Sequence, residues 1–237
     1  MFEAIRSKLV GAWKELRSRG LPSLFVFEFV VVLLGVLAAQ WVADWARERQ
    51  AVAEMEDAKT KAEYQIGVSM HTLETWGKLS PCLEDAMRTV MRANEDQSPV
   101  DPRILDRPKL MGLELRPLTA QELLRLEKRY GTDAEFAFGN IARSTRTYED
   151  RIDIIQEAWK AFAQIDPSNG KPEKADYQQA RMAASGILAA LRGLEINREN
   201  ILRDARRLNL APFNPYGGRP ASSCEEYWDK GAMYVGD

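Results

Sequence analysis

The chain has 237 residues, of which 45% are hydrophobic and 29% are charged, and its formal net charge is −2. This near balance argues against a nucleic-acid-binding protein, because such proteins carry a strongly basic face. One histidine (His71) and two cysteines (Cys82 and Cys224) are too few for a structural zinc site, which needs about four closely spaced ligands. No nucleotide-binding, zinc-protease or serine-hydrolase motif occurs, so no cofactor is expected.

Residues 1–22 have the pattern of a short amphipathic helix. Five apolar side chains share one stripe of this helix: Phe2, Ile5, Leu9, Trp13 and Leu16. Basic residues lie on both sides of the stripe. Gly20 and Pro22 predict the end of this helix. We expect it to lie in the inner-leaflet interface of a membrane, with Trp13 as an anchor. A frayed basic tail is the alternative.

Residues 23–44 predict a single transmembrane helix. Its apolar run has only Glu28 and Gln40 as clearly polar members. About twenty helical residues, at about 1.5 Å each, cover the hydrocarbon core of a bilayer. Trp41 and Trp45 lie at the far end, as expected for an interfacial aromatic belt.

Two alternatives to a transmembrane helix remain open. A buried helix of a soluble protein can be as long, although one so apolar on every side is unusual. A cleavable signal peptide would use Val36 and Ala38 as its cleavage site, but the apolar run continues unbroken into a helical pattern.

Lysine and arginine are more numerous before the apolar run than directly after it. Arg47 and Arg49 follow it, and five basic residues precede it: Arg6, Lys8, Lys14, Arg17 and Arg19. The positive-inside rule therefore predicts a cytoplasmic N-terminus and an extracytoplasmic C-terminal part.

Glu28 shares one helical face with Val32, Gly35 and Ala39. Gly35 and Ala39 form a small-xxx-small pair, which lets a second helix approach closely. Three interpretations of Glu28 remain open: a group reaching the lipid headgroups, a member of a packing face for a partner helix, and a proton-carrying residue.

This region resembles the N-terminal span of an uncharacterised bacterial family of single-span membrane proteins. The similarity rests on Glu28, Gly35 seven residues later, Trp45 ten further on, and the pair Glu48–Arg49, about 25 residues in all. The family usually has Gln where this chain has Trp41. The resemblance implies a topology, not an activity. We therefore expect a bacterial inner-membrane protein with a periplasmic C-terminal domain.

Residues 45–210 predict a helical bundle. A three–four spacing of apolar residues follows the span: Val52, Met55, Ala62, Ile66, Leu73 and Trp76. We expect the first helix to end at Ser80–Pro81 and a second to run to about Ala93. A proline-rich loop follows, in which a strand is conceivable only at 112–115. Thr119 and Glu122 then predict a capping box.

Two long helices complete the predicted bundle, separated by a break at Asp166–Pro172. The first has the apolar seam Phe138, Ile141, Thr145, Tyr148, Ile152, Ile155, Trp159 and Phe162. The second has smaller seam residues: Ala180, Ala184, Ile187, Leu191, Leu194, Ile201, Ala205 and Leu208, with Arg198 as the exception. Small residues facing large ones favour close antiparallel packing.

Residues 211–237 predict an irregular tail rich in glycine, proline and aromatic residues. The tail is too apolar for a solvated segment, so it wraps the bundle or meets a partner. Cys82 and Cys224 can pair in an exported domain, which would tie the tail to the bundle. Two free cysteines are the alternative.

The sequence favours a non-enzymatic subunit or scaffold of a membrane assembly, with membrane lipid and a membrane-protein partner or a second copy as its contacts. An extracytoplasmic sensor signalling through a partner is the alternative. An enzyme is disfavoured, because Glu195, Glu199 and Asp204 fit a solvated helix face and His71 has no obvious catalytic partner.

Overall fold

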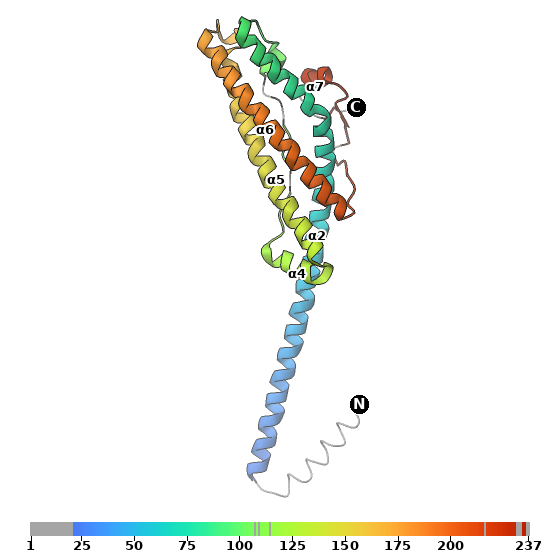
Figure 1. Ribbon diagram of the computed structural model, residues 1–237. Helices are drawn as coiled ribbons and strands as arrows, with labels where there is room; N and C mark the ends of the chain where they lie inside the picture. The colour runs from blue at the N-terminus through green and yellow to red at the C-terminus, as the bar shows by residue number, and fades with distance from the viewer. Residues whose placement is uncertain are drawn as a thin grey trace. The chain divides into compact units, whose positions relative to one another are not determined.

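The computed structural model describes residues 21–106, 108, 110–113, 115–215, 217–230 and 234–235, and the side chains that it describes begin at Phe25. The predicted amphipathic segment, with Trp13, therefore lies almost wholly outside the described residues. The protein is all-α, as the sequence predicts, and its strands are only two residues long (Figure 1). The chain divides into two compact units, residues 1–54 and 55–237.

The first described helix, α2 (Leu21–Asp96), contains the apolar run and continues into the second unit. In the second unit its buried side chains follow the predicted seam, with Met55, Ala62, Ile66, Leu73 and Trp76 all at most 3% exposed. The seam arises because apolar residues three and four apart lie on one side of a helix.

The predicted helix end at Ser80–Pro81 is wrong, because α2 runs through Pro81 to Asp96. A proline inside a helix costs about 3 kcal/mol, since it removes one backbone hydrogen bond and crowds the preceding turn. Pro81 itself is exposed, but Leu79 and Leu83 beside it are fully buried. Burying each leucine contributes about 1.5–3 kcal/mol, which offsets the cost. Figure 1 shows α2 changing direction in its teal-to-green part, as expected for a proline-containing helix.

The segment after α2 is mostly irregular, as its prolines predict. It holds one short helix, α3 (Pro102–Leu105), which Asp101 caps by accepting the backbone N–H of Arg103. No strand occurs among the described residues of 112–115. Helix α4 (Ala120–Tyr130) begins with the predicted capping box, in which Thr119 and Glu122 each accept the other's backbone N–H.

Helices α5 (Thr132–Trp159) and α6 (Lys174–Arg207) lie side by side and are connected through the short 3-10 helices η1 (Lys160–Gln164) and η2 (Pro167–Asn169) (Figure 1). They are antiparallel, and their predicted seams are buried with the exception of the half-buried Leu208. Tyr148 and Trp159 of α5 supply bulk, and Ala180 and Ala184 of α6 allow the close approach.

The tail is less irregular than its composition predicts. It contains one helix, α7 (Cys224–Lys230), and a short antiparallel ladder between β1 (Arg219–Pro220) and β2 (Tyr234–Val235). The sequence gives no alternating apolar pattern there, so this ladder was not foreseen. Pairing of Arg219 with Val235 sets its register.

Candidate functional site

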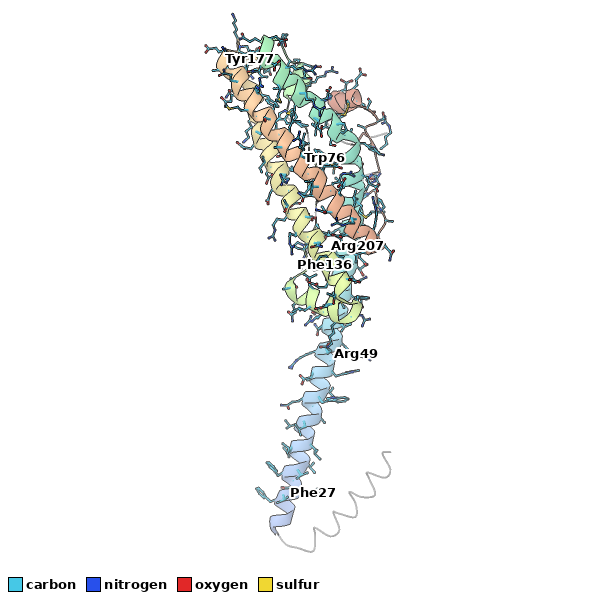
Figure 2. The ribbon with its side chains drawn as sticks, viewed as in Figure 1. Phe27, Arg49, Trp76, Phe136, Tyr177 and Arg207 are labelled. Carbon is cyan, nitrogen blue, oxygen red and sulfur yellow. A yellow bond between two sulfur atoms is a disulfide. The ribbon has the colours of Figure 1, made fainter. Side chains whose placement is uncertain are left out.

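The apolar part of α2 meets the length and composition needed to cross a membrane. Its most apolar 18-residue window has no buried residue, and this is the only such helix among the described residues. Large apolar side chains are exposed throughout it, from Phe25 (77% exposed) to Trp41 (71%). Figure 2 labels Phe27 in this stretch and Arg49 beyond its end. A signal sequence passes the same test of length and composition.

The predicted packing face of Glu28, Val32, Gly35 and Ala39 is exposed along its whole length. A Cβ atom placed on Gly35 would meet no atom within 4 Å. The described chain therefore leaves the space over Gly35 open, and a second helix has room to approach there.

Aromatic and charged side chains lie close together at the end of the apolar run. Trp45 is half exposed, and the guanidinium of Arg49 lies 4.1 Å from the centre of its ring. Asp44 and Arg47 form an exposed ion pair at 3.1 Å. Such amphipathic and charged side chains suit a boundary between an apolar and an aqueous phase.

The tail docks on α2 by a close backbone approach at Gly67. The backbone N–H of Phe213 donates to the carbonyl oxygen of Gly67 at 2.9 Å, and the ring of Phe213 lies 5.2 Å from that of Tyr64. A Cβ at Gly67 would come within 3.0 Å of the carbonyl oxygen of Ala211. Only glycine therefore gives the tail full room here.

A disulfide joins Cys82 of α2 to Cys224 at the start of α7, with 5.3 Å between their Cα atoms. The sequence left open whether these cysteines pair or stay free, and in the structure they are paired. After Cys224 in the same helix, Tyr227 is buried. The ring centre of the next residue, Trp228, lies 6.5 Å from the ring centre of Trp159 on α5. Burial raises the pKa of the Tyr227 hydroxyl. The tail thus packs on its own bundle at these residues.

Several polar atoms are buried inside the bundle with no hydrogen-bond partner among the described residues. They include Nε1 of Trp76, Oγ1 of Thr145, Nε of Arg151 and Nδ2 of Asn197. The Arg151 guanidinium lies against Gly193, where an added Cβ would be only 2.2 Å away. Each unsatisfied group of this kind costs about 1–3 kcal/mol.

These groups share one level of the bundle. Because α5 and α6 are antiparallel and Arg151 meets Gly193, the turn of α6 that carries Asn197 lies beside the turn of α5 that carries Tyr148. The Tyr148 ring meets the Trp76 ring edge-on, 6.5 Å away. Figure 2 marks Trp76 on α2 within the helical bundle. Trp76, Thr145 and Tyr148 belong to the predicted seams, whereas Arg151 and Asn197 do not.

Asp204 does not lie on a solvated face, contrary to the prediction. It is 1% exposed, because it lies between Ile201 and Ala205 on the buried seam of α6. Arg207, one turn further, and the adjacent Arg203 approach its carboxylate at 3.2 and 3.4 Å. These ion pairs compensate the burial of the charge.

Glu195 is half-buried rather than solvated, because it holds Arg198 with hydrogen bonds of 2.8 and 2.5 Å. The Arg198 guanidinium covers Gly77 of α2, which explains why a charged residue interrupts the predicted seam. Glu195 raises the pKa of Arg198 through these bonds. Only Glu199 is exposed as expected.

A cavity of about 480 Å³ lies within the second unit, between α2, the segment before α4 and the tail. Its apolar walls come from Ala58, Ala62, Val68, Leu118 and two prolines, Pro117 and Pro215; Tyr64 and Gln65 also line it. Lys61, Arg116 and Glu122 supply its charges. No local sequence pattern marks this site, because its walls come from three segments that are distant in sequence.

No group of three or more potential metal ligands occurs among the described residues. His71 is half-buried on α2. The chain matches no known protein-family description, no curated protein and no solved structure.

Proposed function

We propose that this protein is a non-enzymatic single-span subunit or scaffold of a bacterial inner-membrane assembly. Residues 23–44 cross the membrane, residues 1–22 lie on the cytoplasmic side, and the helical bundle and tail lie in the periplasm. The packing face of Glu28, Val32, Gly35 and Ala39 binds a membrane partner or a second copy.

The observation that carries the proposal is that no residue in the most apolar window of α2 is buried. Moving one Val, Leu or Phe side chain out of water is worth about 1.5–3 kcal/mol, and many are exposed here. A bilayer supplies the cover that the described chain does not. The Cys82–Cys224 disulfide supports the periplasmic placement, because such bonds persist in oxidising compartments.

Co-purification from membranes in mild detergent, followed by mass spectrometry, tests the partner. We expect Gly35→Leu to remove the partner, because the larger side chain fills the space over Gly35 that a second helix would use. Glu28→Leu tests the polar contact in the same way. Val30→Leu, on the opposite side of the helix, is the matched control and retains the partner. Equal recovery from all variants would reject the packing face.

Labelling with a membrane-impermeant maleimide tests the orientation. The native cysteines are paired, so a new cysteine can be placed at Ser168, which is exposed within η2, or at Ser7. In intact spheroplasts we expect Ser168→Cys to react and Ser7→Cys to react only after lysis. The reverse pattern would overturn the orientation. Recovery of a chain that begins near residue 39 would show that the run is a cleaved signal peptide.

A further inference from the structure

The cavity on α2 has the size of a small-molecule site, which typically lies between about 300 and 1,000 Å³. One side is a helical face on which Ala58 and Ala62 leave room, and Val68 lies further along the same face. Another wall is the segment 116–118, held in place by a hydrogen bond of 3.0 Å from the Arg116 backbone N–H to the Gln65 side chain. These contacts shape the cavity independently of any ligand.

The backbone of the cavity walls offers few free hydrogen-bond donors, and the side-chain donors belong to Lys61, Tyr64, Gln65 and Arg116. The backbone N–H groups of residues 58–68 are used inside α2, and that of Arg116 is bonded to Gln65. Pro117 and Pro215 have no N–H. A peptide strand would therefore find no row of free backbone N–H groups to pair with here, at a cost in affinity. An alkyl chain needs no hydrogen-bond partner, so the walls favour the acyl chain of a ligand.

The charged side chains at the cavity determine which charge the polar head of a ligand should carry. Lys61 is already paired with Asp57 at 2.6 Å. Glu122 accepts the backbone N–H of Thr119 at 2.7 Å, which lowers the pKa of its carboxyl and keeps it ionised. The Arg116 guanidinium is exposed, and within the described part of the chain it makes no ion pair. Arg116 can therefore receive an anion, with Glu122 as the competing negative charge.

We propose that this cavity binds an anionic amphiphile, with its acyl chain against Ala58, Ala62 and Val68 and its anionic head on Arg116. The ligand is a free carboxylic acid or the chain and head of an anionic lipid. The inference depends on the second unit alone and does not require the proposed packing face. Ligand binding is also the property that the sensor hypothesis needs.

The test uses the full chain in nanodiscs of zwitterionic lipid, labelled by a photoreactive analogue of decanoate and mapped by peptide mass spectrometry. We expect saturable labelling within residues 58–68 and 115–118, competed by decanoate but not by decyltrimethylammonium, which has the same chain and the opposite charge. Labelling confined to residues 25–43, or equal competition by the cation, would show simple partitioning and overturn the proposal.

Variants connect the labelling to the named residues. Arg116→Gln should weaken decanoate binding by about tenfold, which corresponds to about 1.4 kcal/mol, because it removes the positive charge that receives the anionic head. Arg146→Gln, an exposed arginine on α5, is the matched control and should leave binding unchanged. Ala58→Trp should fill the cavity and abolish labelling, with the helical circular dichroism signal retained. Unchanged binding in Arg116→Gln would overturn the site.

A second lipid composition distinguishes a free carboxylic acid from an anionic lipid as the occupant of the cavity. If anionic lipid is the occupant, nanodiscs that contain phosphatidylglycerol should suppress decanoate labelling at residues 58–68. If labelling is the same in both compositions, the occupant is a free acid. Absence of saturable labelling in zwitterionic nanodiscs would reject the anionic amphiphile site.

Discussion

The backbone N–H of Phe213 donates a hydrogen bond to the carbonyl oxygen of Gly67, 2.9 Å away, and so binds the start of the tail to the middle of α2. Further along the tail, the disulfide joins Cys224 to Cys82. Between these two contacts, residues 213–224 of the tail and residues 67–82 of α2 run in the same direction. The tail therefore lies along α2 in parallel. This arrangement also forms one edge of the cavity, at Pro215.

Gly67→Ala should loosen the start of the tail. The new methyl group would lie 3.0 Å from the Ala211 carbonyl oxygen, and the tail backbone would have to move away. We expect faster amide hydrogen exchange at Phe213 and faster proteolysis of residues 209–215.

Gly186→Ala is the matched control for this change. Gly186 lies within α6 with no atom within 4 Å of an added Cβ, so only helix propensity changes. It should stabilise the protein by about 0.5–1 kcal/mol and leave the tail unaffected. Equal exchange rates at Phe213 in the wild type and in Gly67→Ala would contradict the close approach.

Replacing both Cys82 and Cys224 by serine should destabilise the protein. The bond spans 142 residues of sequence, and in the chain-entropy model closing such a loop contributes about 5 kcal/mol. Native strain often lowers this value, so we expect a loss of about 2–5 kcal/mol in the free energy of unfolding. Denaturant titration with and without reductant measures it, and the reductant should have no effect on the double variant. Two thiols alkylated in the unreduced native protein would show that the bond is absent.

Thr145→Val should stabilise the protein. Valine and threonine have nearly the same shape, so the change mainly removes the hydroxyl group. Thr145 is 4% exposed, and its hydroxyl has no hydrogen-bond partner among the described residues. Replacing it by a methyl group removes an unsatisfied polar atom, which should raise the free energy of unfolding by about 1 kcal/mol. Thr147→Val is the control, because that hydroxyl donates to the Arg143 carbonyl at 3.2 Å. A loss of stability in Thr145→Val would show that the hydroxyl is satisfied in solution.

The tail should loosen in acid because of Glu226. Its carboxylate accepts hydrogen bonds from the Arg219 guanidinium and from the backbone and hydroxyl of Ser222, and these lower its pKa from 4.5 to about 2. A depressed native pKa means that the contribution is complete above pH 4.5 and is lost as the pH falls towards 2. Amide exchange at Ser222 should therefore accelerate over this range. Glu226→Gln should be equally loose at neutral and acidic pH; an acid-induced acceleration that persists in this variant would assign the effect to another group.

The sequence by itself determined the helical class, the apolar run, the capping box at Thr119 and both long seams of α5 and α6. Each of these is a local signal, since helical periodicity and capping depend on residues within a few positions of one another. The composition of the tail also predicted that it would not form a long helix.

The tertiary structure decided the features that join distant segments. Pro81 stays within a helix, and Leu79 and Leu83 beside it are buried. Asp204 is buried as well, although its charge favours solvent. Each of three features needs segments to meet that are far apart in sequence. The disulfide and the close approach at Gly67 join residues over a hundred positions apart, and the cavity joins segments that are tens of residues or more apart. No local pattern records such meetings, because burial and contact depend on how the whole chain packs.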